Sequence, residues 1–281
     1  MITVRRAGLR RYKLIKNSLK SFDSSSFRFY SRFDGSFVLY IFRRECWLIM
    51  NDSALLGIIF TSHIKQQIYY VPVSQKQFSF MAVAFLIKKY TNSAGYTLKL
   101  IYSSASFKAA SQYLRVRPVT DIKHMKCNIS SSNISNPFLP QGVEIHTMKN
   151  GEESIRAELQ NSIFGANKNR IPITIDEVIG EKRIKGYIGP MCYILKVNGI
   201  PAGYGQIMII DDEYSLINFG LIPSYRGYGY GDIFLKYILY KCESSGILSL
   251  HLTVDNNNPP AISLYKKNGF MELYNTADII I

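Results

Sequence analysis

Residues 221–231 read LIPSYRGYGYG, and this stretch decides how the rest of the chain is interpreted. Three glycines at alternate positions let the backbone turn sharply and approach a ligand without clashes from Cβ atoms. The stretch lies between an expected strand at 214–222 and an expected helix at 232–243. Because the first N–H groups of a helix are unpaired and carry partial positive charge, this arrangement favours an anion such as a pyrophosphate.

Two other phosphate-binding motifs do not fit this stretch. The Walker pattern GxxxxGK[ST] is absent, and the dinucleotide fingerprint GxGxxG fails because the spacing here is GxGxG. The pattern GYGYG alone is typical of a flexible turn as well as of a binding loop. Its position between a strand and an amphipathic helix favours the binding loop.

Two motifs together resemble those of a known family. Arg226-x-x-Gly229-x-Gly231 after Leu221-x-Pro223 is similar to the acetyl-CoA signature of the GCN5-related N-acetyltransferase (GNAT) superfamily. The stretch VDNNNPPAISLYKKNGF at 254–270 resembles the second signature and follows at the right distance. The resemblance covers residues 142–281 and implies an α/β fold, with a mixed, mostly antiparallel sheet flanked by helices.

The resemblance also implies roles for individual residues. The strand before the loop would splay from its neighbour and expose backbone groups to the thioester at Phe219, Gly220 and Leu221. The loop would bind the pyrophosphate of acetyl-CoA through Arg226, Gly227, Tyr228, Gly229, Tyr230 and Gly231. Asn258 would bond the pantetheine arm, and Tyr265 would be the general acid toward the departing CoA thiolate. No metal ion is implied.

The implied reaction is direct attack of a primary amine, on a small molecule or a peptide, on acetyl-CoA. Such a transfer passes through an oxyanion that needs a preorganised donor, and the N–H of Leu221 is the candidate. A tyrosine hydroxyl, with an ordinary pKa of about 10, can protonate a thiolate and still be protonated at neutral pH. The alternative for Tyr265 is a core aromatic on an amphipathic helix, in a chain with 20 tyrosines.

The general base stays open at this point. Related enzymes that act on protein N-termini often have a glutamate five residues before the motif asparagine, where this chain has Thr253. The other candidates are Glu213, His251, or a water held by Asn218 and Thr253. A histidine can titrate in the right range, but inside a strand it is more often structural. We assign no base.

Hydrophobic periodicity predicts the order β-α-α-β-β-β-α-β-α-β for the second half. Strands are expected at 143–148, 191–197, 202–210, 214–222, 247–254, 270–274 and 278–281. Helices are expected at 152–163, within 168–181, at 232–243 and at 260–267. Asn198-Gly199 predicts a hairpin turn, and Thr174 and Asp176 are candidate helix caps.

The first half predicts β-β-β-α-β-α, which matches the later part of the same order. Strands are expected at 36–51, 54–61, 67–73 and 95–102, and helices at 75–90 and 106–114. The segment at 68–80 aligns with 218–230, with Pro72 set against Pro223. We interpret the first half as a smaller, degenerate GNAT-like copy; an unrelated α/β domain is the alternative. The segment at 73–80 has no glycine, so we expect no cofactor there.

Composition and charge divide the chain in two. Residues 1–140 hold 21 Lys and Arg against 5 Asp and Glu, whereas the remainder holds 13 against 15. The segment at 127–141, CNISSSNISNPFLPQ, has the composition of a linker. We therefore expect a basic domain at 1–126 and a transferase domain at 142–281. A basic half is either a solvated surface or attracts an anion, so a second class of function is a nucleic-acid- or ribosome-associated protein docking on RNA.

Other sequence features constrain location and partners. No apolar run approaches the roughly 20 residues of a membrane span, so no membrane contact is expected. Residues 1–20 are basic without a continuous apolar stretch, which favours a solvated basic arm over a transit peptide. The four scattered cysteines lack a CxxC pair and fit free thiols in a cytoplasmic protein. Arg28-Phe29-Tyr30 and Arg32-Phe33 would suit RNA, but no RRM, KH or zinc signature accompanies them.

Overall fold

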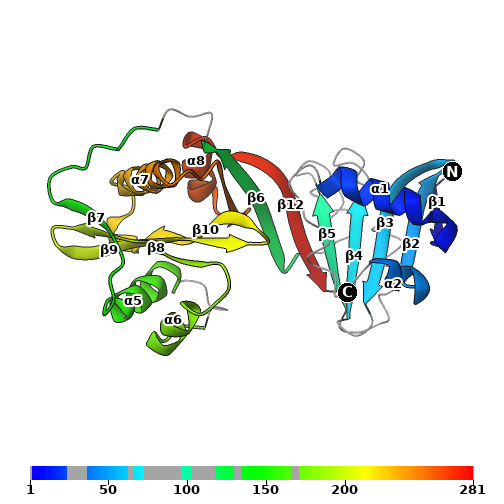
Figure 1. Cartoon of the computed structure of the whole chain (residues 1–281), viewed down its shortest axis with the longest axis horizontal. Coiled ribbons are helices and arrows are strands. Elements are labelled where there is room, and N and C mark those ends of the chain that lie inside the picture. Colours follow the sequence, from blue (N-terminus) through cyan, green and yellow to red (C-terminus); the bar gives the residue numbers. More distant parts are fainter. Residues whose placement is uncertain are drawn as a thin grey trace. The chain divides into compact units, whose positions relative to one another are not determined.

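Figure 1 shows the computed structural model of the chain. The structure describes residues 2–23, 37–62, 66–72, 96–102, 118–129, 134–165 and 171–280. The chain forms two compact units. The first unit comprises Met1–His124, Asp255–Asn257 and Glu272–Ile281. The second unit comprises Met125–Val254 and Asn258–Met271.

The second unit is built on one mixed sheet with the strand order β6-β11-β10-β9-β8-β7. The strands are β6 (Thr120–Asn128, its second half in this unit), β7 (Val143–Thr147), β8 (Tyr187–Val197), β9 (Ile200–Ile210), β10 (Glu213–Leu221) and β11 (Ser249–Asp255). Strands β7 to β10 pair antiparallel with their neighbours, whereas β10 and β11 pair parallel. The predicted Asn198-Gly199 turn joins β8 to β9, with φ of 51° and 78° at its two residues.

Helices cover both faces of this sheet (Figure 1). They are α5 (Glu153–Phe164), α6 (Ile175–Glu181), α7 (Tyr230–Ser244) and α8 (Pro259–Lys267). Helices α5 and α6 lie on one face, and α7 and α8 on the other. Thr174 starts α6 with a capping box, in which its hydroxyl accepts from the Glu177 N–H and the Glu177 carboxylate accepts from the Thr174 N–H. The predicted cap at Thr174 is confirmed.

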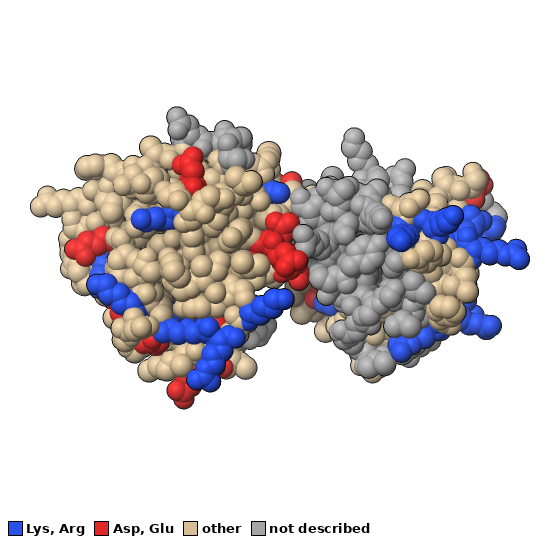
Figure 2. Space-filling view, viewed as in Figure 1, with Lys and Arg blue, Asp and Glu red and all other residues tan. Residues whose placement is uncertain are grey.

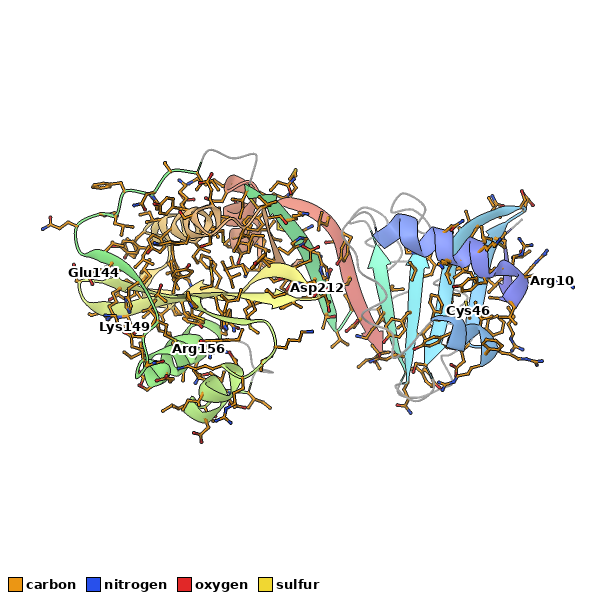
Figure 3. All side chains as sticks on the ribbon, in the orientation of Figure 1. Arg10, Cys46, Glu144, Lys149, Arg156 and Asp212 are labelled. Carbon is orange, nitrogen blue, oxygen red and sulfur yellow. The ribbon has the colours of Figure 1, made fainter. Side chains whose placement is uncertain are left out.

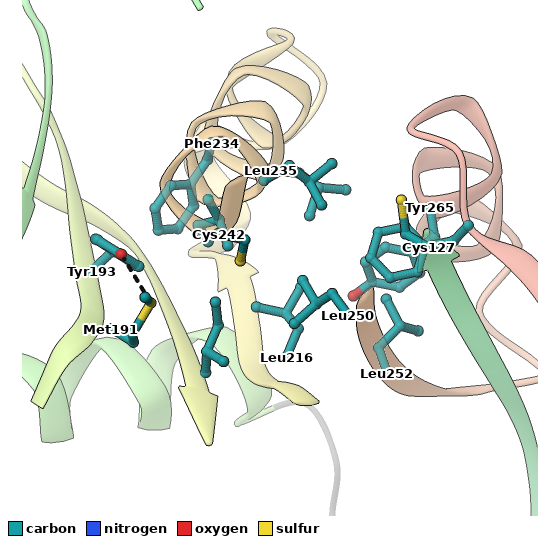
Figure 4. Packing of buried hydrophobic residues seen from close by; sticks show 14 of the residues in the cluster. Cys127, Met191, Tyr193, Leu216, Phe234, Leu235, Cys242, Leu250, Leu252 and Tyr265 are labelled. Atoms are coloured by element: carbon teal, nitrogen blue, oxygen red, sulfur yellow. Dashed lines mark hydrogen bonds between the residues drawn. The ribbon is translucent and has the colours of Figure 1, made fainter. Parts of the chain in front are cut away.

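The main core of the second unit lies between the sheet and helix α7. Figure 4 shows Phe234, Leu235 and Cys242 on α7, with the Cys242 sulfur directed toward Leu216 of β10. Phe234 and Leu235 are fully buried, and burying such a side chain contributes about 1.5–3 kcal/mol to stability. The apolar positions from which this helix was predicted are therefore the positions that are buried against the sheet.

The first unit repeats the same sheet plan, with the order β1-β2-β3-β4-β5-β12. The strands are β1 (Ile2–Arg6), β2 (Cys46–Asn51), β3 (Ala54–Ser62), β4 (Gln67–Pro72), β5 (Thr97–Tyr102) and β12 (Met271–Ile280). Strands β1 to β4 pair antiparallel, β4 and β5 pair parallel, and β5 and β12 pair antiparallel. The described helices are α1 (Tyr12–Asp23) and α2 (Phe37–Phe42).

The two units have matching strand orders. In each unit, four antiparallel strands lead to a parallel pair, β4–β5 in the first and β10–β11 in the second. Strand β4 thus occupies the place of β10, as the alignment of 68–80 with 218–230 predicts. The expected α/β fold, in which a second, smaller copy of the plan precedes the main domain, is confirmed.

The last strand of each half belongs to the other half's unit. Residues Asn275–Ile280 of β12 pair antiparallel with β5, although β12 ends the second half of the sequence. Strand β6 ends the first half, yet its last residues lie beside β11, and the Ile129 N–H donates to the Leu248 carbonyl over 2.9 Å. The compact units therefore differ from the predicted domains at 1–126 and 142–281, because Glu272–Ile281 groups with the first unit.

Several sequence expectations for the first unit need correction. The predicted basic arm at 1–20 forms β1, which pairs with β2 from Ile2↔Asn51 to Arg6↔Trp47, and most of α1. The start of the predicted strand at 36–51 forms helix α2 instead. A short apolar run such as FVLYIF is compatible with a strand or a helix, so the sequence pattern did not distinguish the two.

Strand β6 was not predicted. Its buried face alternates at Lys123, Met125 and Cys127, and a lysine at one of these positions hides the alternation in the sequence. The Lys123 ammonium bonds the carboxylate of Glu272 and the side-chain oxygen of Asn275, which permits its burial. Strand β6 overlaps the start of the predicted linker at 127–141.

Some expectations lie outside the described residues. These are the helices expected at 75–90 and 106–114, the loop counterpart at 73–80, and the Arg28 and Arg32 segments. All four cysteines are buried as free thiols. Among the described residues, no helix combines the length and apolar character needed to cross a bilayer.

Candidate functional site

A pocket of about 510 Å³ lies in the second unit, between the end of β10, the loop after it and the start of α8. Nine of the sequence-predicted site residues line it: Phe219, Gly220, Leu221, Arg226, Gly227, Gly229, Gly231, Asn258 and Tyr265. Tyr228 and Tyr230 do not. The Tyr228 side chain is 72% exposed, and Tyr230 packs against the core, so only their backbone groups stay candidates for ligand binding.

The pocket exists because β10 separates from β11. The two strands pair at Ser215↔His251 and Leu216↔Leu252. Beyond this point β10 contains a bulge between Ile217 and Gly220, and Asn218 within it has φ of 51°. A bulge bends its strand and ends regular pairing. Residues 219–221 consequently line the pocket, and the splay expected from the resemblance is present.

The loop depends on glycine at two positions. Gly227 and Gly229 have φ of 86° and 84°, where other residues cost roughly 1–2 kcal/mol. No atom lies within 4 Å of where a Cβ would stand on either residue. Gly229 is also the N-cap of α7 and has no side chain to accept from the first N–H groups. Those donors are left for water or an anionic ligand.

Arg226 braces the loop. Its Nε donates to the Leu221 carbonyl over 2.9 Å, and its Nη2 donates to the Ile163 carbonyl over 2.8 Å. The guanidinium therefore ties the loop to β10 and to the end of α5. Sequence reasoning placed Arg226 among the cofactor-binding residues and missed this positioning role.

Asn258 begins helix α8. Its Oδ1 accepts from the Ala261 N–H over 3.2 Å, which is an N-cap bond. Its Nδ2 has no partner among the described residues, and the residue lines the pocket. The side chain can therefore cap the helix and donate to a ligand carbonyl at the same time.

Tyr265 closes the inner end of the pocket. Its side chain is buried against Phe219 and Phe270, with ring centroids 6.2 and 5.7 Å away. Figure 4 shows the ring beside Cys127, Leu250 and Leu252. Burial raises the pKa of Tyr265 to about 12, and its hydroxyl has no hydrogen-bond partner among the described residues. At neutral pH it is a protonated donor without a protein acceptor.

Asp232 is a pocket residue that sequence reasoning did not single out. It lies in the first turn of α7 and accepts from Lys236, Lys267 and Asn268 over 3.0, 2.9 and 2.8 Å. Burial raises the pKa of Asp232, but these bonds outweigh burial and hold it at about 2. The carboxylate thereby links α7 to the end of α8.

Replacing Asp232 with Asn is expected to lower the free energy of unfolding at pH 7 by about 1–2 kcal/mol. The folded-state pKa is depressed, so this stabilisation is complete above the unfolded pKa of about 3.9 and disappears as pH falls toward 2. Urea unfolding at pH 7, 4 and 3 measures the difference between variant and wild type.

The matched control is Asp176→Asn, which changes a solvent-exposed aspartate in the first turn of α6. It should cost no more than the helix-dipole contribution, about 0.3–1 kcal/mol. A loss for Asp232→Asn that is equal at all three pH values would show that packing, rather than charge, is responsible.

The base candidates lie on the sheet beyond the pocket. His251 Nε2 is 3.2 Å from the Glu213 carboxylate, and neither residue lines the pocket. Burial lowers the pKa of His251, and the facing Glu213 carboxylate opposes the shift. Thr253 is exposed, whereas Asn218 immediately precedes the pocket residue Phe219. The geometry leaves the base unassigned.

These features define a class of protein. A bulged strand that splays from its parallel neighbour, a glycine loop at a helix N-terminus, and an Asn and a Tyr on the next helix are the arrangement expected of a GNAT domain. Residues 164–270 match the Acetyltransferase (GNAT) family.

Two curated relatives are similar to part of this chain. The [ribosomal protein bS18]-alanine N-acetyltransferase of Escherichia coli K12 is 33% identical over 78 residues, which are 28% of this chain and 53% of that protein. A putative [ribosomal protein bS18]-alanine N-acetyltransferase of Bacillus subtilis is 33% identical over 76 residues, 27% of this chain and 50% of that protein. The chain thus spans about half the length of these relatives.

Solved structures share the fold along nearly the whole chain. A GCN5-related N-acetyltransferase from Sphaerobacter thermophilus has a TM-score of 0.61 at 15% identity, covering 99% of this chain and 94% of that one. A GNAT-family acetyltransferase from Colwellia psychrerythraea has a TM-score of 0.50 at 12% identity, covering 100% and 99%. At these identities the similarity shows the fold and no more.

Proposed function

We propose that the second unit transfers an acetyl group from acetyl-CoA to a primary amine, with a peptide or protein N-terminus as the favoured acceptor. The pocket carries the proposal, because it brings the splayed strand, the glycine loop, Asn258 and Tyr265 around one space. The residues present fit the co-substrate: the loop has unpaired N–H donors for a pyrophosphate, and Asn258 keeps a free amide for the pantetheine arm.

The chemistry follows from these positions. The amine nitrogen attacks the thioester carbonyl, the new C–N bond forms, and the carbonyl oxygen takes the negative charge. The Leu221 N–H is our candidate donor to that oxyanion. When the oxyanion collapses, the C–S bond breaks, the sulfur takes the electron pair, and Tyr265 supplies its proton. The proton lost by the amine goes to a base or to water.

The environment of Tyr265 suits the role of proton donor. Its raised pKa keeps the hydroxyl protonated in the resting site, and the absence of a protein partner leaves it free for the sulfur. The same raised pKa reduces the driving force for complete transfer to a thiolate. We therefore expect its contribution at the lower end of the range for general acids.

The acceptor is proposed from the relatives. Relatives that match 28% and 27% of this chain are named for acetylating an alanine of ribosomal protein bS18, which supports an N-terminal amine rather than a small molecule. Acetyl transfer is tested with the full chain, acetyl-CoA and a peptide that begins with alanine, by measuring CoA thiol release and the mass of the peptide. The same peptide with a blocked N-terminus is the control.

An increase of 42 Da in the open peptide alone, the mass of one acetyl group that replaces a hydrogen, is the expected result. Equal thiol release with both peptides would mean that water, or a lysine side chain, is the acceptor. Transfer to polyamines or aminoglycosides, with no transfer to any peptide, would contradict the peptide acceptor and leave the acetyltransferase proposal standing.

A further inference from the structure

Arginines gather on the surface of the first unit. Six of them lie around strand β1, the start of α1 and the turn before β2: Arg5, Arg6, Arg10, Arg11, Arg43 and Arg44. All six are exposed, and within the described part of the chain none forms an ion pair with an acidic side chain. Figure 2 shows blue side chains over this part of the first unit, and Figure 3 shows Arg10 pointing outward from the start of α1.

The local fold brings these arginines together. Arg5 and Arg6 end the edge strand β1, opposite Leu48 and Trp47 of β2. The 3-10 turn Leu9–Arg11 then leads directly into α1. Arg44 lies in the turn between α2 and β2, with φ of 61°. The end of β1, the 3-10 turn and the turn before β2 therefore present guanidinium groups near one another.

Two hollows lie among these arginines. The smaller, of about 160 Å³, is lined by Arg5, Arg6 and Arg11, with Asp52 as its only acidic residue. The larger, of about 440 Å³, is lined by Arg6 and Arg44 together with Leu9 and Phe42. Arg6 lines both hollows.

Arg6 is also held in place. Its guanidinium lies 4.7 Å from the centroid of the half-buried Trp47 ring, which fixes it by a cation–π contact. A guanidinium fixed in this way loses less side-chain entropy when it binds an anion than a freely moving one. This contact preorganises one guanidinium of the surface, on the Trp47 side of strand β2.

We propose that these six arginines, with Phe42, form a binding surface for single-stranded nucleic acid. Guanidinium groups bind phosphate oxygens in a bidentate manner, and several unpaired ones along a surface follow a phosphate backbone. The Phe42 side chain is 63% exposed beside the larger hollow, where it can stack on a base. Part of the excess positive charge of the first half therefore lies on this surface, and its proposed ligand is single-stranded nucleic acid.

The ligand class follows from the shape and chemistry of the surface. An unpaired strand would use both features of the surface, with its phosphates on the arginines and a base on Phe42. The smaller hollow sets three arginines against one carboxylate, which leaves it positive at neutral pH. Base stacking and phosphate binding together select an unpaired strand over a duplex, whose bases are covered.

The test uses the full chain and a fluorescently labelled oligouridine, with fluorescence anisotropy over a series of salt concentrations. The variant Arg11→Gln/Arg44→Gln removes one arginine from each hollow. We expect its affinity to fall by about tenfold or more, and its salt slope to fall by about 0.7 for each lost phosphate contact. The lysine pair Arg11→Lys/Arg44→Lys keeps the charge and should recover part of the loss.

The matched control is Arg183→Gln/Lys185→Gln, which removes two exposed positive charges from the second unit. It should change affinity by less than about twofold, since its charges are outside the surface. Thermal melting checks that all variants fold. An oligothymidine of equal length is a second arm. If it binds as tightly as the oligouridine, only phosphates and bases are recognised. If it binds more weakly, the surface prefers RNA.

Three results would overturn the proposal. The first is wild-type protein that fails to bind either oligonucleotide at physiological salt. The second is an equal loss of affinity in Arg11→Gln/Arg44→Gln and in the matched control, which would show that only the net charge of the protein matters. The third is retention of the wild type by anionic vesicles while the oligonucleotides stay unbound, which would make the surface a membrane contact.

Discussion

Replacing Tyr265 with Phe is expected to reduce acetyl transfer by about 10²-fold, the lower end of the 10²–10⁴ range for general acids. The change removes one hydroxyl and keeps the ring that packs against Phe219 and Phe270. Acetyl-CoA affinity and thermal stability should therefore stay close to those of the wild type. Turnover with a verified acceptor, together with isothermal titration of acetyl-CoA, measures the two effects separately.

Tyr193→Phe provides the matched control. Tyr193 is buried in the same core, does not line the pocket, and donates its hydroxyl to the Met191 sulfur over 3.4 Å. Its replacement should cost no more than about 1 kcal/mol of stability and leave turnover unchanged. Full turnover in Tyr265→Phe would make Tyr265 a core aromatic, and a loss of tenfold or less would mean that water can replace it.

Replacing Gly229 with Ala is expected to weaken acetyl-CoA binding by about tenfold or more, because a methyl group would stand where the loop meets the pyrophosphate. The residue has φ of 84°, so the variant also carries about 1–2 kcal/mol of backbone strain. Isothermal titration of acetyl-CoA and thermal melting distinguish lost binding from lost folding.

The control for that strain is Gly246→Ala. Gly246 has φ of 73° and open space around its Cβ position, as Gly229 does, but it follows the far end of α7 and is not part of the pocket. The two variants should lose similar stability, and only Gly229→Ala should lose affinity. Equal acetyl-CoA affinity in both would refute the assignment of the loop.

Much of the second unit could be predicted because its signals are local. The turn at Asn198-Gly199, the cap at Thr174 and the glycines of the loop each express a backbone requirement that few residues meet. The apolar spacing of α7 likewise reports which face is buried. These features depend on neighbours within a few positions, and the sequence displays such neighbours directly.

The remaining features depend on distant partners. The burial of Lys123 depends on its bonds to Glu272 and Asn275, which lie 149 and 152 positions away in the sequence. Arg226 resembles a phosphate ligand until the Ile163 carbonyl is known to accept from it. Asp232 likewise acquires its role from Lys267 and Asn268 on another helix. Patterns within a few neighbouring residues carry no information on partners from distant parts of the chain.

The position of β12 at the end of the chain affects when the first unit can finish folding, because β12 pairs with β5 of that unit. A growing chain can form β1 to β5 early, but the edge of β5, with its buried Leu98 and Leu100, has no partner until residues 275–280 have been made. An unpaired strand edge is a template for association with other chains. The first unit is therefore the first to be synthesised and the last to be completed, and a premature stop after residue 270 would expose that edge while sparing the glycine loop.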